Sequence, residues 1–164
     1  MASENEGSGQ YLTFTLAVET FAIDIRTVRE IITQPPMTQV PLMPKFIRGI
    51  INLRGAVVPV VDLQSRFGWE RAVESKKTCI VIIDSSSESG PTQVGLMVDA
   101  VSEVIDIAAE NIEPPPQFGT PVHQDLIAGM AKVEDAFIVI LKPERAFDMQ
   151  VLTSLVEQAE PSLA

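Results

Sequence analysis

The sequence predicts a mainly β protein built from small closed or nearly closed β-barrels. Short runs rich in β-branched residues alternate with turn residues along most of the 164-residue chain, which is typical of such folds. Two of these runs, Ile47–Leu53 and Ala56–Val61, flank Arg54-Gly55 and predict a β-hairpin. A weaker copy of this hairpin follows 80 positions later, which predicts two related units in one chain.

The internal repeat runs without a gap through both hairpins. Matched positions, each 80 apart, include Ile47 with Ile127, Gly49 with Gly129, Ala56 with Ala136 and Phe67 with Phe147. A shorter echo relates Val28–Ile32 to Val101–Ile105 at an offset of 73, so a seven-residue change in length falls in the loop between the two echoes. We therefore expect one subdomain over about 11–76 and a second over about 77–148.

The first unit begins with a predicted hairpin. After a polar, acidic start at 1–10 that is expected to be disordered, strands are expected over Tyr11–Val18 and Phe21–Ile25, with Glu19-Thr20 as the turn. Thr27-x-x-Glu30 has the spacing of a helix capping box, but the β-branched residues around it favour a strand. This segment is therefore expected to be part helical turn and part strand.

Prolines and a cap delimit the hairpin around Arg54-Gly55. Gln34–Pro44 contains four prolines, which lack the amide donor that a sheet interior needs, and is expected to be an extended loop. After the hairpin, Asp62 is expected to cap a short helical turn that runs to Phe67 and stops at Gly68. The charged stretch Trp69–Lys76 is the expected linker between the two subdomains.

The second unit repeats this order. Strands are predicted over Thr78–Asp84, Val94–Asp99, Ser102–Ile107, Ile127–Val133 and Ala136–Leu141. The small polar residues 85–91 predict a loop between the first two of these strands, and Glu134-Asp135 predicts the turn of the second hairpin. A C-terminal helix and tail are expected over 149–164, capped by Asp148. Its apolar face would contain Met149, Leu152, Leu155 and Val156.

Charge and composition argue against several classes of function. The chain has 12 basic and 22 acidic residues, a net charge of −10, whereas phosphate contacts need clustered Lys and Arg. One Trp and one Tyr also offer little for base stacking, so a nucleic-acid-binding barrel is disfavoured. The apolar runs are far shorter than the ~18 residues of a membrane span, and the N-terminus lacks a signal-peptide pattern. We therefore expect a cytoplasmic protein without direct membrane insertion. Cys79, in the apolar run CIVII, is interpreted as an inert core residue.

The sequence offers few candidates for catalysis. Five aspartates lie at or near predicted strand ends, where carboxylates cap turns. They are Asp24, Asp62, Asp84, Asp99 and Asp106. A small hydrolase using Asp62 or Asp99 is the enzymatic alternative, but neither has a base or nucleophile beside it. His123 is the single histidine, which leaves little material for a metal site or a catalytic triad. The sequence thus predicts no enzymatic activity, no metal and no cofactor.

Arg54, at the tip of the first hairpin, allows two interpretations. As a turn residue it would form a surface ion pair of small energetic value. As the anchor for a partner's carboxylate it would make a bidentate contact, for which an exposed arginine on an acidic protein is well suited. The residue pattern is compatible with both.

Four stretches of the chain together resemble the CheW family of chemotaxis coupling proteins. They are FAIDIRTVREI, GIINLRGAVVPVVDL, VGLMVDAVSEV and IEPPPQF. The resemblance spans nearly the whole chain, from about Tyr11 to the predicted C-terminal helix, and implies two SH3-like β-barrels side by side without enzymatic activity. It also implies a scaffold, monomeric when free, that couples the cytoplasmic tips of methyl-accepting chemoreceptors to the regulatory domain of the histidine kinase CheA. Such a scaffold is recruited to membrane-associated receptor arrays.

The resemblance further implies roles for individual residues. The receptor contact, in a groove between the barrels, would use Val28, Glu30, Gly49 and Arg54. Val57 would lie at the principal kinase contact, and Phe118 at the position used for ring assembly. A basic residue found near this position in some relatives is Glu113 here, a departure from the family pattern. A CheW-like adaptor of a pathway controlling pilus motility or development is the alternative, and the sequence fits it equally well.

Overall fold

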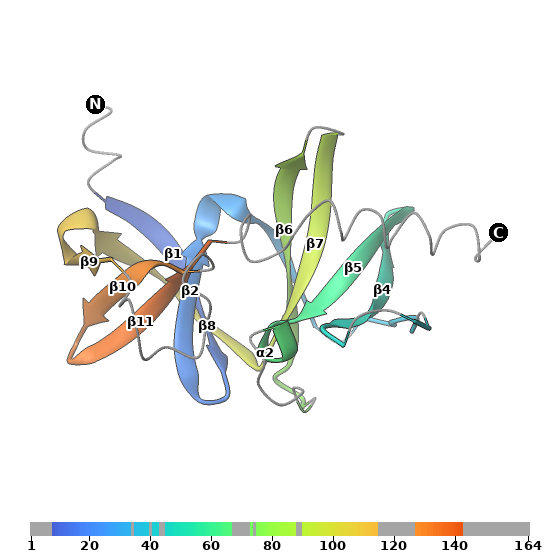
Figure 1. Ribbon diagram of the computed structural model, residues 1–164, viewed down its shortest axis with the longest axis horizontal. Helices are drawn as coiled ribbons and strands as arrows, with labels where there is room; N and C mark the ends of the chain where they lie inside the picture. The colour runs from blue at the N-terminus through green and yellow to red at the C-terminus, as the bar shows by residue number, and fades with distance from the viewer. Residues whose placement is uncertain are drawn as a thin grey trace.

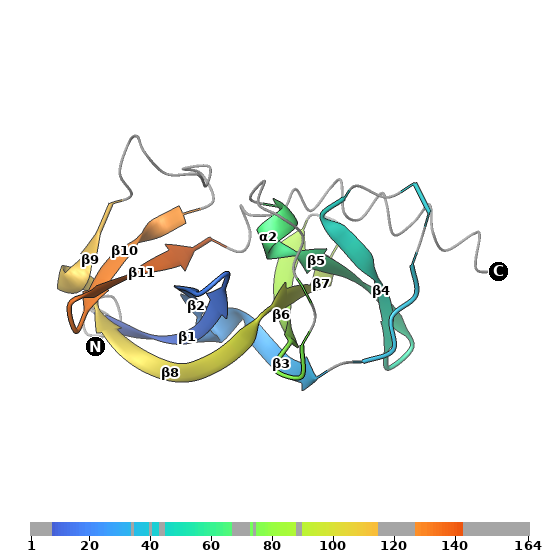
Figure 2. The same ribbon diagram turned by 90° about the horizontal axis from the view of Figure 1, so that it is seen from below.

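The structure, a computed structural model, describes residues 8–33, 35–39, 41–42, 45–66, 73, 75–87, 90–114 and 127–142. Within these ranges the chain forms two β-sheets that lie side by side in both views (Figure 1, Figure 2). The six-stranded sheet, here called barrel A, has the order β8-β1-β2-β11-β10-β9, and the five-stranded sheet, barrel B, has the order β3-β6-β7-β5-β4. The predicted mainly β fold with two SH3-like subdomains is confirmed.

The strands and short helices follow one another along the chain as follows. The strands are β1 (Ser8–Leu16), β2 (Glu19–Asp24), β3 (Val28–Thr33), β4 (Ile47–Leu53), β5 (Ala56–Asp62), β6 (Cys79–Ser87), β7 (Gly90–Val98), β8 (Ala100–Ala108), β9 (Ile112–Glu113), β10 (Ile127–Val133) and β11 (Ala136–Leu141). The helices are η1 (Ile25–Thr27) and η2 (Ala109–Asn111), both 3₁₀, and α2 (Leu63–Arg66). Asp62 caps α2 as predicted, since its Oδ1 accepts a hydrogen bond from the Ser65 N–H at 3.2 Å.

Each sheet closes because the chain that leaves one edge strand returns to the opposite edge. In barrel B, the segment after β3 pairs with β4 through Thr38 and Ile50, with both N–H···O distances at 2.8 Å. In barrel A, β8 leads through η2 to β9, where Glu113 lies opposite Met130 of β10. Residues 35–39, expected as an extended loop, thus carry the bridge that closes barrel B.

Each barrel takes strands from both halves of the chain. Barrel A combines β1 and β2 from the first half of the chain with β8, β9, β10 and β11 from the second half. Barrel B combines β3, β4 and β5 from the first half with β6 and β7 from the second half. The boundary near residue 76 suggested by the repeat is therefore not the boundary between the two sheets. A sequence repeat shows which segments are alike but not which strands they pair with, and here β3 pairs with β6 while β8 pairs with β1.

The strand pairing reproduces the internal repeat. Matching pairs in the two hairpins are Ile47–Val61 with Ile127–Leu141, and Gly49–Val60 with Gly129–Ile140, and the register shifts at the same place in each. In the parallel pairings, Val60 lies opposite Gly95, and Ile140 lies opposite Ala22. β2 and β7 therefore match at an offset of 73, the same as the shorter echo in the sequence.

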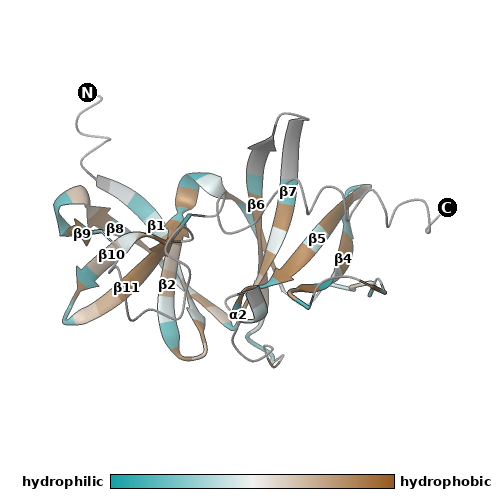
Figure 3. Ribbon diagram, in the orientation of Figure 1, coloured by the Kyte–Doolittle hydropathy of each residue, from teal (hydrophilic) through white to brown (hydrophobic). Residues whose placement is uncertain are grey.

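Hydrophobic side chains form a core inside each barrel. The core of barrel B contains Ile51, Val58, Val60, Ile80, Ile82 and Met97, and that of barrel A contains Ala22, Ile107, Ala131, Ile138 and Ile140. Three members of the first set, Ile51, Val58 and Val60, have their repeat partners in the second. Figure 3 shows hydrophobic residues along most of the two matching strands β5 and β11.

A third core joins the two barrels. Its buried members include Leu12, Phe14, Leu16, Phe21 and Ile23 from barrel A, and Val61, Val81, Ile83, Leu96 and Val98 from barrel B. The Phe14 and Phe21 rings stack with their centroids 6.3 Å apart. Alternate residues of a strand face opposite sides, so one side of these strands fills a barrel while the other fills the joint.

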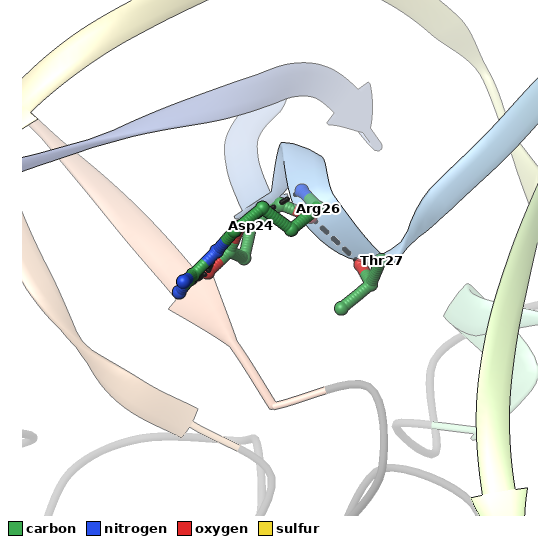
Figure 4. A network of polar contacts seen from close by, with 3 residues as sticks. All are labelled: Asp24, Arg26 and Thr27. Atoms are coloured by element: carbon green, nitrogen blue, oxygen red, sulfur yellow. Dashed lines mark hydrogen bonds and ion pairs between the residues drawn. The ribbon is translucent and has the colours of Figure 1, made fainter. Parts of the chain in front are cut away.

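The chain crosses from barrel A to barrel B through η1 (Figure 4). Asp24 caps η1, accepting hydrogen bonds from the Arg26 N–H at 2.9 Å and from its guanidinium Nη2 at 2.7 Å. Thr27 Oγ1 donates to the Asp24 carbonyl at 2.7 Å. The capping box read from Thr27 and Glu30 was therefore wrong, because Thr27 ends a turn that begins at Asp24. The strand interpretation of the following residues is confirmed, since β3 begins at Val28.

The first turn also differs from the sequence prediction. It lies at Ala17-Val18, with φ of 50° and 64°, and not at Glu19-Thr20, which belong to β2. Thr15 pairs with Thr20 and Leu16 with Glu19, so the ladder continues to the last residue before a two-residue turn. The polar side chains of β2 suggested a turn, but backbone pairing decided otherwise.

Two polar segments predicted as irregular are strands. Ser8–Gln10, expected within a disordered start, pair with β8 from Asp106 to Ala108. Of residues 85–91, expected as a loop, Ser85–Ser87 and Gly90-Pro91 continue the ladder between β6 and β7. Antiparallel pairing uses main-chain groups, so a neighbouring strand can extend a ladder through residues with low strand preference.

Some predicted elements lie outside the described residues. These are residues 1–7, most of the Trp69–Lys76 linker, the end of the helical turn at Phe67, Phe118, His123, and the C-terminal helix and tail after Asp148.

We predict that Gly49→Ala and Gly129→Ala each lower the free energy of unfolding by about 1 to 3 kcal/mol, the usual cost of overpacking. A Cβ at Gly49 would lie 2.7 Å from the Thr38 carbonyl oxygen, and one at Gly129 would lie 2.8 Å from that of Glu113. Denaturant unfolding of both variants measures the effect.

Gly9→Ala is the matched control for these variants. A Cβ there meets its nearest atom, on Tyr11, at an ordinary 3.5 Å, so stability should change little. Wild-type stability in either barrel-closing variant would contradict the tight approach.

Candidate partner-binding surface

The tip of the first hairpin carries an exposed arginine in an uncommon backbone conformation. Arg54 has a φ of 53° and Gly55 a φ of 86°, the left-handed pair that suits a two-residue turn between twisted strands. The side-chain oxygen of Asn52 accepts a hydrogen bond from the Gly55 N–H at 3.0 Å and helps to hold this turn. The Arg54 side chain remains 73% exposed, so the hairpin presents a cation to solvent.

Arg54 forms an ion pair with Glu30 across the closure of barrel B. Glu30 lies on β3 at one edge of the sheet, whereas Arg54 follows β4 at the other edge. Nη1 lies 2.5 Å from Oε1 and Nη2 lies 3.3 Å from Oε2, so both carboxylate oxygens are engaged. The hydrogen bond from Arg54 lowers the pKa of Glu30 and raises the pKa of Arg54. A guanidinium has five N–H donors, so this pair leaves others for a partner.

Val28 and Glu30 lie on either side of a β-bulge. The register with β6 shifts between them, which makes Arg29 the extra residue of β3. Arg29 Nε lies 3.0 Å from Asp84 Oδ2 on β6. Val28 is half-buried and packs against the core that joins the barrels, whereas Glu30 reaches Arg54 at the closure. This strand therefore runs from the inter-barrel joint to the hairpin tip.

The other residues assigned by resemblance occupy different places. Gly49 is buried against Thr38 and Met37, so it supports the closure from inside and does not line an open groove. Val57 is half-buried on β5, opposite Asn52, close in sequence to the tip. Phe118 lies outside the described residues. Thus the structure brings Glu30 and Arg54 into contact and places Gly49 beneath the segment that follows β3.

Sequence reasoning missed two polar links. Asp62 is fully buried, and Arg48 Nη1 lies 3.3 Å from its Oδ2, so the cap of α2 also has a cationic neighbour. Gln64 Nε2 of α2 donates to Asp99 Oδ1 at 2.9 Å, and Asp99 Oδ2 accepts from the Ala17 N–H at 2.9 Å. Asp99 thereby connects α2 to the β1–β2 turn of the other barrel. The sequence gave no signal for the Asp99 link, because it joins distant segments. Arg48 and Asp62 lie on the two strands of the predicted hairpin, so their contact follows from its pairing.

Four of the five aspartates considered at strand ends make side-chain contacts within the fold: Asp24, Asp62, Asp84 and Asp99. Asp24 lines a cavity of about 760 Å³ at the end of barrel A together with Tyr11 and Asp106. The side-chain hydrogen bond from Arg26 lowers the pKa of Asp24, which keeps it ionised and unsuited to act as a general acid near neutral pH. In the ranges that the structure describes, His, Cys, Asp and Glu form no group of three that could hold a metal ion. Cys79 is half-buried beside the inter-barrel core, less enclosed than the sequence suggested.

The geometry defines a class of protein in which two small β-barrels share a core and present a charged hairpin tip. Comparison with known proteins identifies a family within this class. A family model described as a CheW-like domain matches residues 10–151. The chemotaxis protein CheW of Klebsiella aerogenes is 30% identical over 162 residues, covering 99% of this chain and 94% of that protein. The probable chemotaxis protein CheW of Rhizobium etli is 31% identical over 145 residues, covering 88% and 91%.

A solved structure agrees with these matches. The crystal structure of the scaffolding protein TtCheW from Thermoanaerobacter tengcongensis is similar with a TM-score of 0.77 and 39% identity, covering 85% of this chain and 92% of that one. The chain belongs to the CheW family. Among the described residues, no helix has the length and apolar character needed to span a membrane.

We predict that Arg54→Ala raises the pKa of Glu30 toward its ordinary value, because the hydrogen bond that lowers it is lost. In the wild type this pair stabilises the fold above the ordinary glutamate pKa, and its contribution disappears as pH falls through the lowered value. Side-chain NMR titration measures the shift.

Arg29→Ala is the control for this titration. It removes a charge that lowers the pKa of Glu30 less than Arg54 does, so its effect should be smaller. An unchanged Glu30 pKa in Arg54→Ala would show that the pair does not persist in solution.

Proposed function

We propose that this protein is a non-enzymatic scaffold that couples methyl-accepting chemoreceptors to the histidine kinase CheA in chemotaxis. Membership of the CheW family and the chemotaxis and scaffolding names of its relatives support this function. A scaffold acts by raising the effective concentration of its partners and fixing their orientation, and so needs no reactive group of its own. It would work in the cytoplasm, at arrays of membrane-bound receptors.

The exposed Arg54–Glu30 pair is the observation that carries the receptor contact. Arg54 adopts a positive φ that favours glycine and leaves most of its side chain in solvent, features that core packing does not require. Glu30 fixes the guanidinium through two hydrogen bonds, which reduces the freedom that Arg54 would lose on binding. The receptor surface in this proposal runs along β3 from Val28 to Glu30 and ends at Arg54, with Gly49 supporting it from inside.

The kinase contact and ring assembly use other residues in this proposal. Val57, on β5 beyond the tip, contacts the regulatory domain of CheA, and Phe118 contributes to ring assembly. Val57 is half-buried opposite Asn52 on the hairpin, while Glu30 lies on the far edge strand of the sheet. In this proposal the receptor contact at Arg54 and the kinase contact at Val57 belong to the same β4–β5 hairpin, and the receptor surface continues from Arg54 onto Glu30 of the edge strand β3.

We predict that the protein raises CheA autophosphorylation only when a receptor fragment is also present. The physical reason is that bringing receptor and kinase together accelerates the kinase. A mixture that lacks either this protein or the receptor fragment does not assemble the complex. Phosphate incorporation into CheA measures the effect, with mixtures lacking one component as controls. Stimulation without receptor, or hydrolytic turnover by the isolated protein, would contradict the scaffold.

We also predict that Arg54→Ala leaves the melting temperature nearly unchanged but weakens binding of a receptor tip fragment at least about tenfold, or about 1.4 kcal/mol. Arg54→Lys should not restore binding, because an ammonium lacks the planar fork of a bidentate contact. Calorimetric titration measures both variants.

Arg26→Ala is the matched control, since Arg26 is also exposed and ion-paired but lies on η1. It should bind the receptor fragment like the wild type. Undiminished binding by Arg54→Ala would remove Arg54 from the receptor surface.

A further inference from the structure

Barrel A contains a copy of the surface proposed for receptor binding. The hairpins β4–β5 and β10–β11 match at an offset of 80 residues, with the same register shift after Ile47 and Ile127. The glycines that follow occupy the same kind of cradle. A Cβ at Gly49 would meet the Thr38 carbonyl oxygen at 2.7 Å, and one at Gly129 would meet the Glu113 carbonyl oxygen at 2.8 Å.

The edge strands β3 and β8 match as well. In barrel B, Gly95 pairs with Ile82, and Val28 lies opposite the next residue, Ile83. In barrel A, Ala22 pairs with Thr13, and Val101 lies opposite the next residue, Phe14. Gly95 and Ala22 are themselves matched through β5 and β11, so Val28 corresponds to Val101. Two residues further, Glu30 corresponds to Glu103, which bonds to Thr13 Oγ1 through its main-chain N–H at 3.1 Å and C=O at 2.8 Å.

Three of the four residues of the proposed receptor surface are therefore identical in barrel A. Val28, Glu30 and Gly49 have the counterparts Val101, Glu103 and Gly129. The fourth differs, because Glu134 takes the place of Arg54. A partner that recognised backbone shape and these shared residues would find two sites on one chain.

The two hairpin tips have the same backbone shape. Glu134 and Asp135 have φ values of 47° and 66°, both left-handed like those of Arg54 and Gly55. In both hairpins the residues that flank the turn form the last pair of the ladder. The tips differ in side chains, and hence in charge, while their main-chain paths agree.

The charges at the two tips have opposite effects on an acidic partner. In barrel B, Arg54 and Glu30 cancel, with uncharged Asn52 and Gly55 beside them. At the matching positions of barrel A, Glu103, Glu134 and Asp135 carry three negative charges and Lys132 one positive charge, for a net charge of −2, and all four residues are exposed.

We propose that Glu134 confines receptor binding to barrel B by placing a carboxylate where the matching surface has the Arg54 guanidinium. The proposal rests on the proposed receptor contact of Arg54. A receptor carboxylate that docks on the free N–H groups of Arg54 meets like charge at Glu134, and repulsion at a close contact discriminates strongly between otherwise similar sites. The repeated fold thereby acquires a single orientation on the receptor.

The test moves the tip of barrel B to barrel A. Glu134→Arg and Asp135→Gly together reproduce the Arg54-Gly55 turn, and glycine suits the positive φ of Asp135. Four proteins are titrated calorimetrically with a soluble receptor tip fragment: the wild type, Arg54→Glu, the double variant of barrel A, and Arg54→Glu combined with that double variant. The fraction folded is checked for each by denaturant unfolding.

The expected stoichiometries are one fragment for the wild type, none for Arg54→Glu, two for the barrel A double variant, and one for the combined variant. Full binding by Arg54→Glu would refute the receptor contact itself. Loss in Arg54→Glu without recovery in the folded combined variant would leave that contact standing and overturn the role of Glu134.

A measurement without any partner checks the geometry. In the double variant the guanidinium introduced by Glu134→Arg should form an ion pair with the Glu103 carboxylate, as Arg54 does with Glu30. A crystal structure of the double variant shows whether this pair forms. A guanidinium that does not contact Glu103 would show that the two tips do not face their edge strands alike, and would overturn the inference.

Discussion

The shared core between the barrels is the constraint on which the rest of the structure depends. Strands from both sheets, including those of Phe14 and Leu96, bury side chains in it, and each barrel is completed by strands from the opposite half of the sequence. Neither half of the chain can form its own barrel and leave the other behind. The joint therefore couples the two barrels in folding as well as in position, and the link through Asp99 adds hydrogen bonds to the apolar contact.

Closure of the barrels places the candidate surface. β3 ends where its continuation must return to β4, and the tight approach at Gly49 brings Thr38 against that strand. The same return carries Glu30 within reach of Arg54, although the two residues belong to opposite edges of the sheet. A packing requirement inside the barrel thus positions an ion pair on its outer surface. There, on a chain with a net charge of −10, the Arg54 guanidinium is a local cation that a partner can bind.

The repeat supplies the same backbone twice, and side chains distinguish the copies. Barrel interiors keep apolar residues at matching places, since both must be filled at similar density. The hairpin tips face no such requirement, because their side chains lie in solvent. Arg54 and Glu134 can therefore differ in sign without disturbing either barrel, and a nearly twofold scaffold can have one functional side.

The sequence by itself determined the mainly β class, both hairpins, the Asp62 cap and the repeat with its two offsets, because these depend on local periodicity and turn residues. Family membership, and with it Arg54 and Glu30 as candidates, was also readable from contiguous motifs. Tertiary structure decided which strands pair, and so the exchange between barrels, the contact of Glu30 with Arg54 and the burial of Gly49. It also turned polar segments such as Ser8–Gln10 into strands, since ladder partners come from distant parts of the chain and main-chain hydrogen bonds carry no mark in the side-chain pattern.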